Sequence, residues 1–287
     1  EVQSLGKEKG KGRVSQVLHF WKLQWKLRKE YDAVLVHMTP IWIVMGAPLW
    51  ILLRKKMYVW YEARGTRWPL RISLWFVKKV FSASEHGMPL HSRKSVIVGH
   101  GIDTEFFMPG AGSQGAEDRD LPLLITVGRI TASKNLDVIL DAFNQLPDDY
   151  RLKIVGHSIT DADKKLESDL RAQISERVTI QSATQEEVRD LLQKATVFVH
   201  ASETSLDKAV LEAMSSGCPV LSTAEAVHPL LPQEWRTTKD TLGARVKDFC
   251  ELDANERKGI ASGLREQVKQ NHSLERLVGR LVEEMKD

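Results

Sequence analysis

Residues 123–143 read LLITVGRITASKNLDVILDAF, and this stretch carries the pattern that decides the fold. An apolar run of five residues is typical of a buried strand, while apolar residues three and four positions apart are typical of an amphipathic helix. A turn containing Gly128 separates the two patterns. The stretch therefore predicts a strand, a turn and a helix, the first part of a βαβ unit.

The same alternation continues to about residue 223. Further short apolar runs predict strands at residues 152–155, 178–180, 197–200 and 219–222. Strands that alternate with helices predict a parallel sheet covered by helices on both faces, the doubly wound α/β architecture. A weaker form of the pattern predicts strands in the first half of the chain, at residues 33–37, 57–61, 80–83 and 95–98.

The chain of 287 residues is long enough for two domains. Residues 109–120 are rich in Gly, Pro and charged residues and show no apolar periodicity, which predicts a linker. We therefore expect one domain over residues 1–108, a linker over 109–120, and a second domain over 121–287 that closes with helices.

Composition limits the class of protein. With 42% hydrophobic and 28% charged residues, the chain is typical of a folded globular protein. Its two cysteines, Cys218 and Cys250, are too few for a disulfide framework or a cysteine zinc site, which favours a reducing cytoplasm. Residues 33–53 are apolar enough to suggest a membrane span, but Pro40, Gly46 and Pro48 divide the run. A buried strand followed by a short helix explains the same hydropathy, and we favour it.

Charge is distributed unevenly. Residues 1–110 contain 18 Lys and Arg against 8 Asp and Glu, whereas residues 111–287 contain 23 against 30. Seven of the eight tryptophans lie in the first 75 residues. A basic half of this kind implies an anionic partner, either nucleic acid or an anionic lipid surface. Because no nucleic-acid recognition motif accompanies the charge, we expect no nucleic-acid partner.

The basic start of the chain predicts an amphipathic helix. Residues 7–29 contain eight Lys and Arg, and Val14, Val17, Leu18, Trp21 and Trp25 recur at helical spacing. Such a helix either lies on an anionic bilayer or buries the apolar stripe against its own sheet. The sequence leaves both open, and we favour packing against the sheet.

Candidate site residues follow the predicted strands, because open parallel sheets bind ligands beyond the carboxyl ends of their strands. Gly128, Arg129 and Lys134 follow the strand at 123–127, and two cations five residues apart suit a diphosphate. They could equally be exposed loop residues. Ser205 predicts the N-cap of a helix from Leu206 to about residue 216, whose free amides can bind an anion.

Three further residues have two interpretations each. Glu212 lies on that same predicted helix and either reaches a ribose or is a solvated surface carboxylate. His100, between Gly99 and Gly101, indicates a close backbone approach, either to a ligand or to the other domain. His37 ends its predicted strand, where a histidine usually has a structural role.

Five segments taken in order resemble one family. They are GHGIDTEFFMP (99–109), LLITVGRITASKNLDVILDAF (123–143), LKIVG (152–156), LLQKATVFVHAS (191–202) and SLDKAVLEAMSSGCPVLST (205–223). Their order and spacing resemble the retaining glycosyltransferases of family 4. The resemblance implies the GT-B fold, in which two Rossmann-like domains of doubly wound parallel sheet face a cleft.

The resemblance also implies an activity. A hexose would pass, with retention of configuration, from a nucleoside-diphosphate sugar to a carbohydrate or lipid-linked acceptor in cell-envelope polysaccharide or glycolipid synthesis. No cofactor or metal would be needed. The protein would be cytoplasmic and peripheral on the inner face of the cytoplasmic membrane, where an anionic lipid surface is a further expected partner.

Site residues are implied in the same way. Arg129 and Lys134 would be catalytic by neutralising the departing diphosphate. The donor-binding set would be Gly128, Arg129, Lys134, Thr204, Ser205, Leu206 and Glu212, with Glu212 on the ribose. The residues near the cleft would be His37, His100, Gly101, Glu203 and Asp207.

The sequence departs from the family pattern in three places. Thr204 occupies the position of the first Glu in the family's Glu-x7-Glu motif, although a related subgroup shares the SLDK segment. Trp60-Tyr61 is followed by Glu62-Ala63, where the subgroup tends to carry a histidine. The family's opening strand and glycine-rich loop have no counterpart before Glu1, so we expect an incomplete N-terminal domain. The alternative function is therefore a catalytically degenerate GT-B protein that binds a nucleotide or sugar without turnover.

Overall fold

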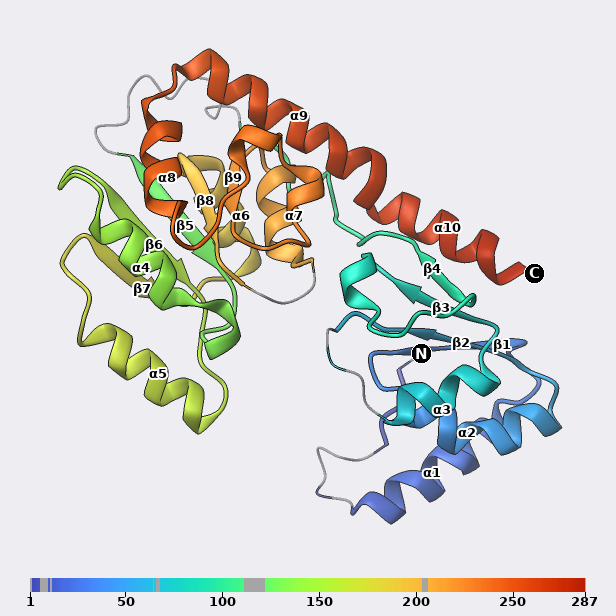
Figure 1. Cartoon of the computed structure of the whole chain (residues 1–287). Helices are drawn as coiled ribbons and strands as arrows, with labels where there is room; N and C mark the ends of the chain where they lie inside the picture. The colour runs from blue at the N-terminus through green and yellow to red at the C-terminus, as the bar shows by residue number, and fades with distance from the viewer. Residues whose placement is uncertain are drawn as a thin grey trace. The chain divides into compact units, whose positions relative to one another are not determined.

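The structure, a computed structural model, describes residues 2–5, 10, 12–63, 65, 68–110, 122–202 and 206–286 (Figure 1). The chain forms two compact units, Glu1–Ile97 and Val98–Asp287. Each unit contains one sheet, and all of the strand pairings within both sheets are parallel. The predicted α/β class with two parallel-sheet units is confirmed.

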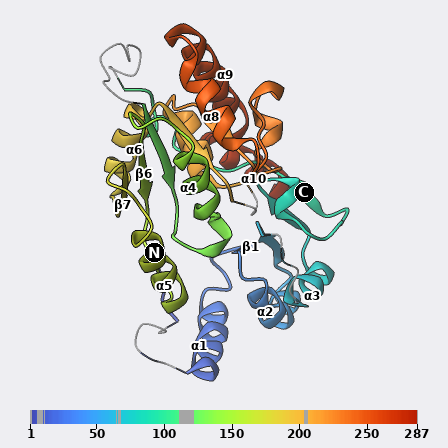
Figure 2. The same cartoon turned by 60° about the vertical axis from the view of Figure 1, so that its left-hand side comes forward.

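The first unit has a four-stranded sheet in the order β1-β2-β3-β4. Its elements are α1 (Arg13–Lys26), β1 (Ala33–His37), α2 (Ile41–Leu52), β2 (Lys56–Trp60), α3 (Trp68–Phe76), β3 (Lys79–Ser82), the 3-10 turn η2 (Glu85–Gly87) and β4 (Ser95–Ile97). The three helices lie on one side of the strands (Figures 1 and 2). They share one core with the strands, in which Phe20, Ile43, Leu70 and Val80 are buried together.

The apolar run at residues 33–53 divides as predicted. It forms β1 and α2, and the turn between them places Met38 at a positive φ of 59°. Among the described residues, no helix has both the length and the hydropathy that crossing a bilayer requires.

The favoured interpretation of the α1 stripe is wrong. Val14, Leu18, Trp21 and Trp25 are between 45% and 75% exposed, and Phe20 is the one buried residue of the helix. The reason lies in the partner that α1 packs against. The Phe20 ring contacts the rings of Trp42 and Trp50, with centroids 4.9 and 5.7 Å away, so α1 rests on α2. Most of the predicted stripe is left exposed, although Val17 is half-buried and the Trp21 indole donates to the Met45 carbonyl at 2.9 Å.

The second unit has a five-stranded sheet in the order β7-β6-β5-β8-β9. Its strands and helices are β5 (Leu123–Val127), η4 (Ala132–Lys134), α4 (Leu136–Asn144), β6 (Arg151–Val155), α5 (Asp161–Arg171), β7 (Val178–Gln181), α6 (Gln185–Lys194), β8 (Val197–His200), α7 (Lys208–Ser215), β9 (Val220–Ser222), η5 (His228–Leu230), η6 (Gln233–Trp235), α8 (Leu242–Glu251), α9 (Ala254–His272) and α10 (Leu274–Lys286).

Both faces of this second sheet are covered. Successive residues of a strand point to opposite faces, and Leu124 and Ile125 accordingly belong to two different core clusters. Residues from α4 and α8 complete one cluster, and residues from α6, α7 and α9 complete the other (Figures 1 and 2). The doubly wound arrangement predicted for this half of the chain is therefore present.

Residues 98–110 pack with the second unit, ahead of the linker predicted at 109–120. Ile102 forms a parallel bridge with Ser273, and Phe107 is buried in the core of the unit. These two apolar side chains are the physical reason that the division falls after Ile97. Residues 111–121 lie outside the described part of the chain, so the boundaries expected at 108 and 121 stay predictions.

Gly156, just after β6, lies very close to the backbone just after β5. A Cβ atom at Gly156 would lie 1.8 Å from the carbonyl oxygen of Gly128. Because that contact is with backbone, we expect Gly156→Ala to lower the free energy of unfolding by about 2–3 kcal/mol. Urea denaturation measures the change.

The matched control is Gly259→Ala. Gly259 lies inside α9, and an added Cβ there would meet nothing within 4 Å. This variant should gain about 0.5–1 kcal/mol from helix propensity. Equal stability of the two alanine variants would contradict the close approach of the two strand ends.

Candidate functional site

The strand order places a topological switch point in the second unit. From β5 the chain crosses to β6 on one side, and β8 pairs with β5 on the other side. Open α/β sheets bind ligands at the carboxyl ends of strands at such a point. Here the ends of β5 and β8 bring Gly128, Arg129 and Lys134 together with His200, and these residues line one small pocket.

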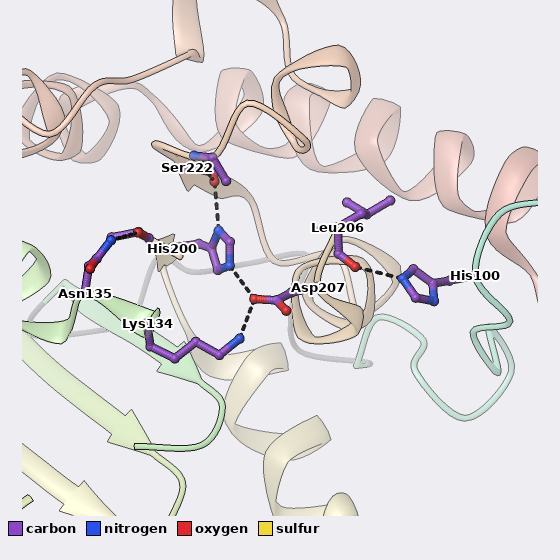
Figure 3. Close-up of polar contacts among 9 residues, drawn as sticks. His100, Lys134, Asn135, His200, Leu206, Asp207 and Ser222 are labelled. Carbon is purple, nitrogen blue, oxygen red and sulfur yellow. Dashed lines mark hydrogen bonds and ion pairs between the residues drawn. The ribbon is translucent and has the colours of Figure 1, made fainter. Parts of the chain in front are cut away.

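A chain of polar contacts crosses this point (Figure 3). The Lys134 ammonium donates to Asp207 Oδ2 at 2.5 Å, and His200 Nε2 lies 2.8 Å from the same oxygen. On the other side of the ring, His200 Nδ1 lies 2.9 Å from Ser222 Oγ. An ionised carboxylate only accepts hydrogen bonds, so Nε2 of His200 carries a proton. Three segments that are distant in sequence are therefore joined through one imidazole and one carboxylate.

Asp207 is ionised at neutral pH. Its partial burial alone would raise the pKa of the carboxyl group. The hydrogen bond from His200 and the charge of Lys134 outweigh burial and hold that pKa well below its usual range. The Lys134 side chain is only 17% exposed, so the interpretation of Lys134 as a solvated loop residue is wrong.

The turn that carries Lys134 is fixed by its neighbour. Asn135 adopts a left-handed conformation with φ of 47°, and its side-chain amide donates to the carbonyl of Ala201 at 2.9 Å. Arg129 differs from Lys134, because its side chain is exposed and has no ion-pair partner among the described residues. The site therefore has one cation that is held and one that extends into solvent.

The predicted start of the helix after β8 is corrected. We expected the helix to begin at Leu206 with Ser205 as its N-cap, but α7 begins at Lys208 with Asp207 in the N-cap position. The Asp207 side chain does not cap the helix, since Lys134 and His200 occupy its carboxylate. The buried Leu206 instead offers its carbonyl to His100. Glu203, Thr204 and Ser205 lie outside the described residues.

Glu212 lies within α7 and is half-buried. Burial raises the pKa of its carboxyl group, while the charge of Lys208 acts in the opposite direction. A solvated surface carboxylate would not show such a desolvation effect. Glu212 is therefore not fully solvated, and its contact with a ribose stays a prediction.

The glycines around His100 make close contacts within their own unit. A Cβ at Gly99 would lie 2.3 Å from the carbonyl oxygen of Asn271, and one at Gly101 would lie 2.7 Å from a methyl carbon of Leu277. The backbone of His100 donates to His272 Nδ1 at 3.1 Å, and its ring Nε2 lies 2.7 Å from the Leu206 carbonyl. The approach predicted from these glycines is thus to the junction of α9 and α10.

The first unit contains two further polar residues of interest, His37 and Glu62. His37 ends β1 as predicted, and its exposed ring stacks on Trp60 with centroids 6.1 Å apart. Glu62, which the sequence did not single out, accepts hydrogen bonds from Ser82, Ala83 and Ser84 at 2.6 to 3.2 Å. A carboxylate with so many donors fixes the turn after β3. Among the described residues, no His, Cys, Asp and Glu side chains gather in a group of three that could hold a metal ion.

His272 gives a prediction about pH. Burial, aided by the nearby charge of His100, lowers the pKa of His272 to about 4. Between about pH 6.5 and pH 4, His272 is protonated in the unfolded chain and neutral in the folded chain. The free energy of unfolding therefore falls as the pH is lowered through this range. The loss should reach about 3 kcal/mol.

The measurement is urea denaturation over this pH range. His272→Gln should flatten the dependence, because a glutamine oxygen can accept the His100 amide without titrating. His157→Gln, at an exposed histidine, should leave it unchanged. An identical slope in the His272→Gln variant would contradict the assignment.

The second unit, which holds this site, is similar to known proteins. Residues 121–242 match the family model described as glycosyl transferases group 1. The sulfoquinovosyl transferase of Arabidopsis thaliana is 31% identical over 144 residues, which is 47% of this chain and 27% of that protein. The chain thus matches only about a quarter of the length of this curated relative.

Solved structures show the same fold. The crystal structure of Anabaena HepE in complex with UDP and glucose has a TM-score of 0.78 at 17% identity, covering 99% of this chain and 83% of that one. Sucrose-phosphate synthase from Thermosynechococcus elongatus has a TM-score of 0.79 at 17% identity, covering 94% and 77%. Residues 121–242 are thus similar to the group 1 glycosyltransferases, and the likeness of nearly the whole chain to these solved structures shows a GT-B-like fold.

Proposed function

We propose that this chain binds a nucleoside-diphosphate sugar at the switch point of the second unit and transfers its hexose with retention of configuration. The observation that carries the proposal is the pair of cations at the end of β5. Arg129 extends into solvent and Lys134 is held at the same pocket, beside the segment that enters α7. The likeness to a structure determined with UDP and glucose supports this class of donor.

Each residue has a role in the proposal. Arg129 and Lys134 stabilise the charge that develops on the departing diphosphate, with Gly128 allowing the backbone to approach it. Leu206, with Thr204 and Ser205 before it, contacts the phosphates, and Glu212 accepts hydrogen bonds from the ribose. The acceptor hydroxyl attacks the anomeric carbon from the face that the diphosphate leaves, and its proton passes to the leaving phosphate oxygen. Two side-chain cations provide the charge neutralisation, so the proposal requires no metal or other cofactor.

The donor roles predict different ligand preferences for the diphosphate and ribose contacts. Charge-assisted hydrogen bonds contribute about 1.5–3 kcal/mol. Arg129→Ala and Lys134→Ala should therefore weaken binding of UDP-glucose by roughly 10- to 100-fold, and binding of uridine hardly at all. Glu212→Ala should weaken both ligands by a similar factor, because a ribose contact does not depend on the diphosphate.

Calorimetric titration of both ligands measures these effects. Lys164→Ala on α5, which removes a cation that is 64% exposed, is the matched control and should change neither affinity. Equal weakening of uridine and UDP-glucose by Arg129→Ala would overturn the diphosphate role.

The helices of the first unit support a lipid-linked acceptor at an anionic membrane. The sequences of α1, α2 and α3 contain Arg13, Lys22, Lys26 and Arg71 but no Asp or Glu. Surface helices of soluble proteins usually mix both signs of charge. A helical layer with cations alone suits a surface of negative charge.

Exposed apolar side chains accompany these cations. Besides the stripe on α1, Trp68 and Trp75 on α3 are 61% and 82% exposed, and Ile51 and Leu52 at the end of α2 are exposed as well. Tryptophan beside Lys and Arg is the composition of helices that lie at the interface of a bilayer. We therefore propose that this layer docks on an anionic membrane, as a peripheral protein on the cytoplasmic face, and that nucleic acid is not its partner.

Vesicle co-sedimentation tests the docking. Binding should require anionic lipid and weaken with added salt. Lys22→Ser with Lys26→Ser, or Leu18→Ser with Trp25→Ser, should lower the bound fraction roughly tenfold.

The control is an apolar stripe of the other unit. Val278 and Val282 on α10 are also about half exposed, at 51% each, but Glu275, Glu283 and Glu284 share that helix. Changing both valines to Ser should leave vesicle binding unchanged. Binding that ignores lipid charge, or a preference for RNA over vesicles, would overturn the docking proposal.

A second function is favoured by Thr204, which replaces the first Glu of the family motif. A chain without that carboxylate could bind the donor and not turn it over. Incubation with UDP-glucose and a polyprenyl-phosphate sugar acceptor separates the two functions. Donor binding with no release of UDP supports the degenerate binding protein, and UDP release with sugar transfer supports the enzyme.

A further inference from the structure

Lys134 carries out two tasks that compete. In this structure its ammonium is 2.5 Å from Asp207 Oδ2. In the proposed function, on which this inference rests, the same ammonium neutralises a diphosphate. One ammonium cannot neutralise a carboxylate and a dianionic ligand fully at the same time, so donor binding changes the charge balance around Asp207.

The charged and titratable groups facing Asp207 come from several segments. Arg129 and Lys134 belong to the turn after β5, and His200 ends β8. Lys208 begins α7, next to Asp207, and is exposed. His228 lies one step further away, where its Nε2 is 3.0 Å from the carbonyl oxygen of Ser222. Of these groups, Lys134 and His200 touch Asp207 directly, and His200 is the one whose side chain can gain a second ring proton.

We propose that donor binding is coupled to proton uptake at His200. Lys134 turns from Asp207 to the diphosphate, and an imidazolium at His200 takes over the neutralisation of Asp207. No covalent bond changes, and solvent supplies the proton. Asp207 and His200 are thus positioning residues that control where the charge of Lys134 is directed.

The contacts of His200 suit both of its protonation states. Its Nε2 proton is directed to Asp207 in either state. Its Nδ1 faces Ser222 Oγ, a hydroxyl that also accepts the Ala224 amide at 3.1 Å. A hydroxyl can rotate, so Ser222 donates to a neutral Nδ1 and accepts from a protonated one. Because the His200 side chain is only 4% exposed, the added charge needs the adjacent carboxylate.

The coupling has a definite sign. A ligand that binds together with a proton binds more tightly as the pH falls. The affinity for the donor should therefore decrease as the pH rises from about 6.5 to 8.5, by up to tenfold per pH unit, which corresponds to one proton.

Isothermal titration calorimetry with UDP-glucose measures the uptake directly. The diphosphate of this ligand is esterified at both ends and does not titrate in this range, so any proton is taken up by the protein. Titrations at pH 7.5 in PIPES, HEPES and Tris, with EDTA present, should show a heat that depends on the ionisation enthalpy of the buffer, equivalent to between about 0.2 and 1 proton per donor.

Variants of the site identify the residue that takes up the proton. His200→Gln keeps a donor toward Asp207 and an acceptor toward Ser222 but cannot be protonated, so its uptake should fall to zero and its affinity should become independent of pH. His228→Gln, at the next histidine in the network, should retain the wild-type uptake. Asp207→Asn should also abolish uptake, because it removes the charge that the proton neutralises.

The outcomes separate the two proposals. If wild-type protein binds no UDP-glucose, the proposed function fails and this inference fails with it. If UDP-glucose binds with no proton uptake, or if His200→Gln binds with undiminished uptake, the proposed function stands and the coupling is overturned.

Discussion

One carboxylate oxygen organises the site of the second unit. Oδ2 of Asp207 receives both Lys134 and His200, and so links the turn after β5, the end of β8 and the entry into α7 (Figure 3). A half-buried ionised carboxylate is stable only with such partners. The loops at the switch point are therefore held in place by charge pairing as much as by the sheet beneath them.

The pairing of Lys134 with Asp207 has a cost for anion binding that the restraint on Lys134 partly offsets. At the proposed diphosphate site a negative charge would oppose the ligand, but the same charge keeps the long Lys134 side chain in a single region and reduces the entropy that a flexible lysine would lose on binding. Arg129 differs, because its guanidinium is exposed and no ion pair with a described residue restrains it. One pocket thus combines a cation held by an ion pair with a cation exposed to solvent.

The sequence predicted the strands of both units and the grouping of Gly128, Arg129 and Lys134 at the end of β5. This succeeded because buried parallel strands are short apolar runs and because their carboxyl ends meet at one edge. The sequence did not single out His200, which joins Lys134 and Asp207 at the same site. The helix after β8 was placed two residues early, since Ser205 is a good cap by type and nothing local reveals that Asp207 is engaged by Lys134, 73 positions away.

Longer-range contacts were also outside the reach of the sequence. The α1 stripe has the spacing of a buried face, but periodicity does not say which apolar side meets the core, and Phe20 took that place. The partners of Gly99 and Gly101 lie at the junction of α9 and α10, some 170 residues along the chain. The two glycines indicate that the backbone there lies close to another segment, but only the folded structure shows which segment that is.

The helical layer of α1, α2 and α3 has a further physical consequence. Its cations have no carboxylate within these helices to shield them, so they repel one another through water, and dissolved counterions supply the relief. Either dissolved anions or an anionic surface can then reduce this repulsion. We therefore expect added salt both to reduce the repulsion within the layer and to weaken its attraction to a charged surface.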